Sequence, residues 1–159
     1  MNKPVLIFEF YNLAIGDNFR FGKLILRTHD RNLRFHATSG LSNFQGIASC
    51  GLVGRGAIPP CEFVSIPTYT VNTSPYPMFG KVGIEGNFYQ IFPYVNNVKV
   101  HNRTSTRGDF GIHQDEGVKG TAGCIGITKG MHWKAFQMEM QSLVTQGFEN
   151  INLFVPVGY

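Results

Sequence analysis

The chain has 159 residues, of which 43% are apolar and 13% aromatic, so it is long enough to bury a core and fits one domain, residues 1–159. Its net charge of +4 comes from 14 basic and 10 acidic residues that are scattered along the chain. A nucleic-acid-binding protein would carry a denser basic stripe with interleaved aromatic residues. No apolar run is long enough to span a membrane. We therefore expect neither nucleic acid nor a membrane as a partner.

The three cysteines, Cys50, Cys61 and Cys124, are an odd number without a recognisable spacing. A disulfide framework is therefore not expected, and at least one thiol should be free. The first residues, MNKPVLIFEFYN, hold a short apolar run that contains Glu9 and no small-residue cleavage site. They predict a first strand and not a signal peptide.

The high content of glycine, proline, Val, Ile, Phe and Tyr favours strands and turns, so we expect a mostly β fold. RFGKLILRT and LRFHATSG alternate in polarity around the turn residues HDRN, which predicts a β-hairpin at residues 20–38. GLVGRGAIPP, at 51–60, predicts a loop. CEFVSIPTYTV, at 61–71, predicts a strand bent at Pro67, which cannot donate a ladder hydrogen bond.

The second half of the chain continues this pattern of short strands. TSPYPMFG, at 73–80, predicts a proline-broken loop, and NFYQIFPYV and VKVHN predict two short strands. FGIH and GCIGI predict two more strands around the loop QDEGVKGTA, and INLFVPV predicts the last strand.

One helix is predicted before the last strand, with its apolar stripe packed on the core. Thr128 is expected to cap its N-terminus and Gly147 to end it. Apolar residues at steps of three, four and seven define the stripe: Trp133, Phe136, Met140, Leu143 and Val144.

His113 and Cys124 stand out in the glycine-rich stretch GDFGIHQDEGVKGTAGCIGI. A catalytic cysteine must lose its proton to a neighbouring base and must be reachable by substrate. Gly123 and Gly126 remove side chains on both sides of the sulfur and free N–H groups for an oxyanion. His113, eleven positions before Cys124, comes within reach if the two strands are adjacent, and a backbone carbonyl near Gln114 could fix its tautomer.

The same stretch resembles the active-site signature of the L,D-transpeptidase (YkuD-like) family, in which a histidine precedes a Ser/Thr-x-Gly-Cys-Ile/Val segment. Thr121, Gly123, Cys124 and Ile125 match that segment. LRFHATSG resembles the family's upstream strand that ends in Ser-Gly. GRGAIPPCEF resembles a further family segment, with Cys61 in place of the usual glycine. The resemblance covers most of residues 20–157 and is closest to the compact relatives found in bacterial toxins and phages.

This resemblance implies an L,D-transpeptidase-like β-sandwich or β-barrel with one main C-terminal helix, acting on bacterial peptidoglycan stem peptides without a cofactor or a metal. Cys124 would attack the carbonyl at the L-centre of a diamino acid, with His113 as the base and the N–H groups of Gly123 and Cys124 around the oxyanion. Gln114, Thr121 and Arg107 would contact the substrate. Water as acceptor gives a carboxypeptidase or endopeptidase, and an amine gives cross-linking or D-amino-acid exchange.

The chain departs from the family pattern at two positions. Gly126 stands where the family commonly has arginine, and Thr121-Ala122 stands where Ser-His is usual. A polar group that would bind substrate is therefore missing, and Arg107 or Lys129 would have to substitute. The loop between His113 and Cys124 is also shorter than in the larger enzymes of the family.

Other interpretations remain open at this stage. A zinc site could draw on His113, Asp115, Cys124 and His132, although Asp115 and Glu116 in a glycine-rich loop are more typical of a solvated turn. A sortase-like enzyme would need an arginine after the cysteine, and the last arginine of the chain is Arg107, so this interpretation is excluded unless a lysine substitutes. A structural phage tail or virion component could keep the fold without activity. With no signal peptide, we expect a virion-associated protein, or one delivered to the host periplasm by a non-standard route, with virion or secretion-machine proteins as further partners.

Overall fold

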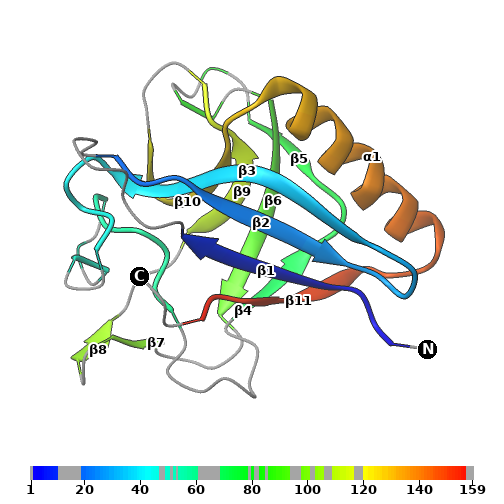
Figure 1. Ribbon diagram of the computed structural model, residues 1–159, viewed down its shortest axis with the longest axis horizontal. Helices are drawn as coiled ribbons and strands as arrows, with labels where there is room; N and C mark the ends of the chain where they lie inside the picture. Colours follow the sequence, from blue (N-terminus) through cyan, green and yellow to red (C-terminus); the bar gives the residue numbers. More distant parts are fainter. Residues whose placement is uncertain are drawn as a thin grey trace.

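The structure is a computed structural model (Figure 1), and most of the chain is described in it. The described residues are 2–10, 19–46, 49–50, 52, 54–60, 69–78, 80, 83–84, 86–93, 98–100, 103–105, 109–116 and 120–156. In chain order the elements are β1 (Val5–Phe10), β2 (Gly22–Arg27), β3 (Asn32–Leu41), β4 (Tyr69–Asn72), β5 (Tyr76–Met78), β6 (Gly86–Pro93), β7 (Val98–Val100), β8 (Arg103–Ser105), β9 (Phe110–Gln114), β10 (Gly120–Ile127), α1 (Gly130–Thr145) and β11 (Asn150–Phe154).

Within this described part, eight strands form a closed β-barrel in the order β4-β11-β1-β2-β3-β10-β9-β6, because β6 also pairs with β4. The pairs β1–β11 and β9–β10 are parallel, and the other neighbours in the barrel are antiparallel. β5 extends the sheet beyond β6, and β7 and β8 pair separately. The prediction of a mostly β fold with one helix near the C-terminus is confirmed. The sequence had left a β-sandwich and a β-barrel as alternatives, and the structure shows the barrel.

The barrel interior is filled by alternate residues of its strands, as expected where one face of a sheet is buried. β9 and β10 show this directly, because the residues at every second position belong to the buried core. The buried core residues of these two strands are Phe110, Ile112, Ile125 and Ile127. The residues that alternate with them, Gly111, His113, Cys124 and Gly126, therefore lie on the outer face of the barrel.

α1 closes one end of the barrel with the predicted apolar stripe. Phe136 packs edge-on against Phe35 of β3, at 5.4 Å between ring centroids, and against Tyr89 of β6, at 5.2 Å. β3 and β6 are not neighbours in the barrel, so one helix residue bridges two walls. The other buried residues of α1 are Trp133, Met140 and Leu143, whereas Val144 is half-buried.

The predicted end of α1 is confirmed and its predicted N-cap is wrong. Gly147 has φ +92° and its N–H donates to the Val144 carbonyl at 2.9 Å, a helix end that favours glycine. At the other end the N-cap is Lys129, without a side-chain cap. Thr128 is engaged elsewhere, because its hydroxyl donates to the His36 carbonyl at 3.2 Å. A tertiary partner on β3 thus takes the hydroxyl that the local pattern assigned to the helix.

Three further strand predictions can be compared with the described residues. The hairpin at 20–38 is confirmed as β2 and β3, whose pairing closes at Arg27 and Asn32. TSPYPMFG is not purely a loop, because β5 pairs there with β6 and puts Tyr76 opposite Phe88. Pro77 is tolerated in β5 because this strand lies at the edge of the sheet. Most of CEFVSIPTYTV, including Pro67, lies outside the described residues, and its end forms β4.

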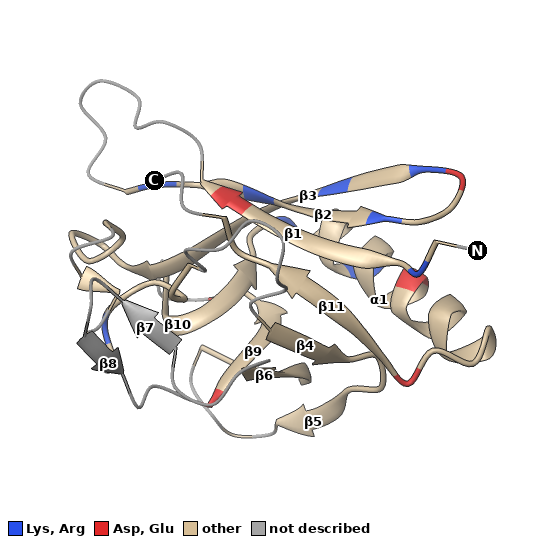
Figure 2. Cartoon of the chain, turned by 90° about the horizontal axis from the view of Figure 1, so that it is seen from below, with Lys and Arg blue, Asp and Glu red and all other residues tan. Residues whose placement is uncertain are grey.

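Blue positions are spread along β2 and β3 and occur near their hairpin (Figure 2), and Arg27, Arg31 and Arg34 are exposed. Arg31 also ties this hairpin to α1 through two contacts of 2.9 Å with the Glu139 carboxylate. Ser39 and Gly40 lie near the opposite end of β3, away from the hairpin. In the described part of the chain, no helix combines the length and the apolar character needed to cross a membrane.

Candidate active site

His113 and Cys124 lie on adjacent strands, as predicted. β9 and β10 pair in parallel, with Ile112 opposite Ile125 and His113 opposite Gly126. Because side chains alternate along a strand, Cys124 shares the outer face with Gly126 and therefore with His113. The strand spacing and the two-residue offset place the Cα atoms of His113 and Cys124 about 8 Å apart.

The ring of His113 is held in one tautomer. Its Nδ1 lies 2.7 Å from the carbonyl oxygen of Gln114. Since a carbonyl can only accept, Nδ1 carries the proton and Nε2 keeps its lone pair when the ring is neutral. His113 is 3% exposed, and burial lowers its pKa from the usual 6.5, an effect that the bond to Gln114 partly opposes. His113 is therefore a neutral base at neutral pH, oriented by the backbone carbonyl that the sequence suggested.

The thiol of Cys124 faces the start of β9 in this structure. Cys124 is 7% exposed, and its Sγ lies 3.9 Å from the carbonyl oxygen of Asp109. In the part of the chain that is described, no hydrogen bond joins this thiol to His113. One rotation about the Cα–Cβ bond of Cys124 moves Sγ among its three staggered positions. Transfer of the thiol proton to His113 would therefore require Sγ to leave its position beside the Asp109 carbonyl.

A large bulge carries the cysteine. In the ladder between β3 and β10, Gly120 pairs with Leu41 and Ile125 pairs with Ser39, so four residues of β10 face the single residue Gly40. Gly123 lies inside the bulge with φ +115°, a conformation that favours glycine. Bulges of this kind redirect side chains and interrupt the ladder. Here the bulge lifts the backbone on the N-terminal side of Cys124 out of regular pairing.

Two buried hydroxyls fix the bulge. The Thr121 hydroxyl donates to the Cys124 carbonyl and accepts from the Gly40 N–H at 3.3 Å. The Ser39 hydroxyl lies 3.5 Å from the Gly123 carbonyl and accepts from the Ile58 N–H at 2.8 Å. Three segments that are distant in sequence thus meet around Gly40: the end of β3, the loop before residue 60, and the bulge.

Phe88 forms a wall beside the two candidate residues. Its ring stacks against His113 with a centroid distance of 6.2 Å and an interplanar angle of 12°. The same ring lies over Gly111, where a Cβ would come within 2.0 Å of it. Gly111 is level with Cys124 in the register of β9 and β10. Only a glycine at this position lets the Phe88 ring lie against the backbone of β9.

The side chain of Asp115 covers Gly126. A Cβ at Gly126 would lie 2.8 Å from the Cβ of Asp115, 3.2 Å from its Cγ and 3.0 Å from Cγ2 of Thr121. Asp115 is half-buried, whereas Glu116 is exposed. The expectation of a solvated turn is therefore wrong for Asp115 and right for Glu116. No larger side chain fits at Gly126 while Asp115 keeps this position.

The remaining predicted site residues are placed as follows. Thr121 is 4% exposed and its hydroxyl is occupied by backbone groups. Gln114 orients His113 through its carbonyl, and its side-chain amide lies near the first residue of α1. Lys129 is exposed before α1, and its charge helps to lower the pKa of His36 after the larger effect of burial. Arg107 and Cys61 lie outside the described residues.

The candidate zinc ligands do not assemble where the structure describes them. No three His, Cys, Asp or Glu side chains of the described residues gather in a way that could hold a metal ion. His132 is engaged with β3, because its Nδ1 accepts the His36 N–H at 2.8 Å.

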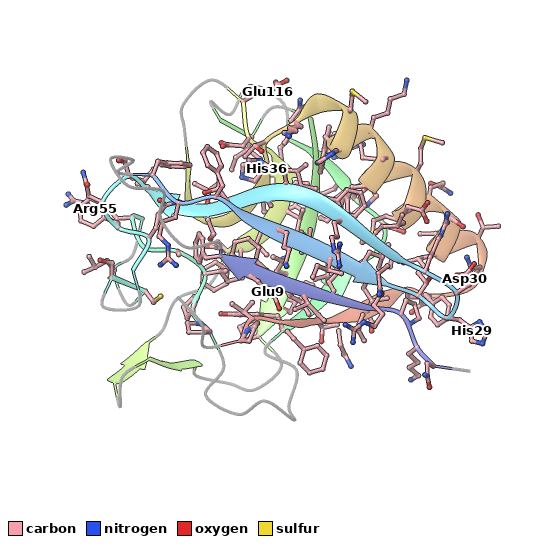
Figure 3. The ribbon with its side chains drawn as sticks, viewed as in Figure 1. Glu9, His29, Asp30, His36, Arg55 and Glu116 are labelled. Carbon is pink, nitrogen blue, oxygen red and sulfur yellow. The ribbon has the colours of Figure 1, made fainter. Side chains whose placement is uncertain are left out.

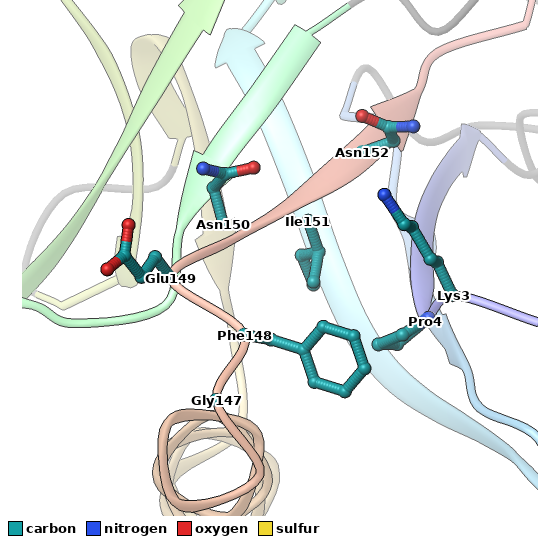
Figure 4. Close-up of a pocket in the computed structure, with 8 residues that line it drawn as sticks. All are labelled: Lys3, Pro4, Gly147, Phe148, Glu149, Asn150, Ile151 and Asn152. Carbon is teal, nitrogen blue, oxygen red and sulfur yellow. The ribbon is translucent and has the colours of Figure 1, made fainter. Parts of the chain in front are cut away.

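A hollow of about 300 Å³ lies at the end of α1, away from these residues (Figure 4). Its walls come from the chain before β1, the turn after α1, and β11, with Lys3, Phe148 and Asn152 among the lining residues. None of the candidate catalytic side chains lines it. The candidate nucleophile and base, Cys124 and His113, lie instead on the outer face of β9 and β10.

Phe88 was not predicted as a neighbour of the site, and Asp115 was considered only as one of four possible zinc ligands. Glycines inside two strands, Gly111 and Gly126, were the available signal, because such glycines often mark a close approach by another group. Comparison with known proteins adds no assignment: no protein-family model, no curated protein and no solved structure matches this chain.

Proposed function

We propose that the protein is a cysteine acyl transferase or peptidase that acts on the stem peptides of bacterial peptidoglycan, with Cys124 as nucleophile and His113 as base. The observation that carries the proposal is the ring of His113. Its Nδ1 is bound to the Gln114 carbonyl, so Nε2 carries the lone pair, and the side chain of His113 belongs to the outer face that Cys124 shares. A neutral imidazole beside a thiol is the pairing that cysteine acyl transfer requires.

The chemistry proceeds in two balanced steps. Nε2 of His113 takes the proton of the Cys124 thiol while Sγ forms a bond to the carbonyl carbon of the substrate. The C–N bond then breaks, and the imidazolium returns the proton to the departing amine, which leaves a thioester on Cys124. In the second step water or an amine attacks the thioester, His113 takes the proton of the attacking group, and the thiol is restored.

The bulge supports this mechanism. The carbonyl oxygen gains negative charge during attack, and backbone N–H groups are effective at stabilising it. Gly123 and Cys124 belong to the bulge, where the ladder with β3 is interrupted. The hydroxyls of Ser39 and Thr121 hold the carbonyls of Gly123 and Cys124. These contacts fix the peptide planes on both sides of the nucleophile before substrate arrives.

The substrate class comes from the resemblance of His113 and the segment Thr121–Ile125 to the L,D-transpeptidase signature. In that family the attacked carbonyl belongs to the L-centre of a diamino acid and the departing group is a D-amino acid. A virion-borne or secreted protein that meets the host periplasm would have access to such peptides. Hydrolysis and transfer share the same first step and differ only in what attacks the thioester.

Digestion of purified peptidoglycan tests the proposal. Wild type, Cys124→Ala and Cys50→Ala are incubated with the polymer, and the released stem peptides are identified by mass spectrometry. Cys50 is a buried core thiol, so its loss matches the change at Cys124 without touching the outer face of β9 and β10. We expect new products from wild type and Cys50→Ala and none from Cys124→Ala. Identical product profiles for wild type and Cys124→Ala would refute the proposal.

A further inference from the structure

The carboxylate of Asp115 occupies a particular position beside the candidate nucleophile. Asp115 follows β9, and its N–H donates to the Ile127 carbonyl at 2.9 Å, which continues the ladder with β10 by one residue. Its side chain then lies directly over Gly126, the residue paired with His113. Cys124 precedes Gly126 by two positions, so the thiol and the carboxylate of Asp115 lie over the same, outer face of β10.

The surroundings of this carboxylate favour a cationic ligand. In the described part of the chain its one polar contact is with the Gly120 N–H, at 3.4 Å from Oδ2, and it forms no ion pair there. Burial raises the pKa of Asp115, an effect that the Gly120 N–H partly opposes. A carboxylate that is partly buried has lost part of its hydration, so a positive group that approaches it stabilises its negative charge.

We infer that Asp115 is a specificity-determining residue whose carboxylate binds a primary ammonium group on the substrate. The inference rests on the proposed function, because it takes Cys124 as the attacking residue. Gly126 makes this site possible. An arginine side chain at position 126 would cover the strand, whereas the glycine leaves room for the carboxylate of Asp115, whose charge is opposite to that of arginine.

The spacing selects the length of the side chain that carries the ammonium group. Two residues of an extended strand separate Cys124 from Gly126, which is about 6.6 Å. A lysine side chain extends about 6 Å from Cα to Nζ, since it is built from bonds of about 1.5 Å. The ammonium of a four-carbon side chain therefore reaches Asp115 when its own residue provides the attacked carbonyl. A two-carbon side chain ends well short of it.

The charge of Asp115 can be removed without removing its structural contacts. Asp115→Asn keeps the volume over Gly126 and an oxygen that accepts the Gly120 N–H, but it has no negative charge. Glu116→Gln is the matched control, because it removes the same charge one residue further on. Glu116 is exposed and lies at the surface beyond β9 (Figure 3).

Peptide binding to the Cys124→Ala protein tests the inference without turnover. Three tetrapeptides that end in D-alanine are titrated by calorimetry, with L-lysine, Nε-acetyl-L-lysine or L-2,4-diaminobutyrate in third place. We expect the lysine peptide to bind about tenfold more tightly than the other two, as a charge-assisted hydrogen bond provides. Adding Asp115→Asn should abolish this difference, and adding Glu116→Gln should preserve it. Equal binding of the three peptides, or a preference that survives Asp115→Asn, would overturn the inference.

The two proposals fail in different ways. If peptidoglycan digestion shows no product that depends on Cys124, the proposed function fails, while an Asp115-dependent preference in the binding experiment still supports the ammonium site. If digestion depends on Cys124 but the lysine and acetyl-lysine peptides bind equally, the role of Asp115 is refuted and the catalytic assignment stands.

Discussion

The substitution Thr121→Val tests whether the bulge around the nucleophile is held by a buried hydroxyl. Valine has nearly the same shape as threonine, so the change removes the hydroxyl and little else. It leaves the Gly40 N–H and the Cys124 carbonyl without their side-chain partner. A buried backbone group that loses its partner costs about 1–3 kcal/mol. The Gly40 contact is long at 3.3 Å, so we expect a total loss of roughly 2–4 kcal/mol in the free energy of unfolding.

Urea denaturation followed by circular dichroism measures this loss. We expect a lower midpoint with an unchanged slope, because the substitution alters stability and not the area exposed on unfolding. Thr70→Val on β4 is the control, since Thr70 is also half or more buried in a strand and no hydrogen bond of its hydroxyl is among the described contacts. Its stability should stay within about 0.5 kcal/mol of wild type. If Thr121→Val also stays within that range, the hydroxyl does not hold the bulge.

Two further predictions concern the outer face of β9 and β10. Gly126→Ala should lower the free energy of unfolding by about 1–3 kcal/mol, because its Cβ would lie 2.8 Å from the Cβ of Asp115. Gly46→Ala is the control and should leave the free energy of unfolding unchanged, since a Cβ at Gly46 has nothing within 4 Å. Equal effects of the two substitutions in urea denaturation would argue against the close contact. The pKa of His113 is lowered from 6.5 in the folded state. Around and below pH 6.5 the folded protein therefore binds fewer protons than the unfolded chain. The stability that His113 contributes is present above pH 6.5 and is lost as the pH falls. Wild type should therefore lose more stability than His113→Gln between pH 7.5 and 5.5. The pKa of His36 is also lowered, but His36 is present in both proteins, so its contribution cancels in the comparison. Parallel profiles of unfolding free energy against pH would contradict the burial of a neutral His113.

Local patterns in the sequence predicted the elements whose causes are local. The turn residues around Asp30 predicted the hairpin of β2 and β3, and Gly147 predicted the end of α1. The adjacency of β9 and β10 followed from the hypothesis that His113 and Cys124 act together, and the register of these strands bears out that placement.

The features that the sequence did not predict depend on distant partners. The pairing of β6 with β4 that closes the barrel is a contact between strands, not a property of either segment. Thr128 binds β3 because of where β3 runs, and Asp115 covers Gly126 because of a parallel register. The β5 strand was missed because Pro77 is incompatible with a central strand and compatible with an edge.

The central claim is that His113 removes the proton of Cys124, and the rate at which iodoacetamide alkylates Cys124 tests it most directly. The rate is measured at pH 7 in wild type and in His113→Gln, with the modified cysteine identified by peptide mass spectrometry. The thiol is only 7% exposed, which slows alkylation in both proteins alike. The ratio of the two alkylation rates therefore measures the effect of His113 as a base. We expect wild type to react about a hundredfold faster, the lower end of what a positioned base contributes. Equal rates in the two proteins would contradict the claim.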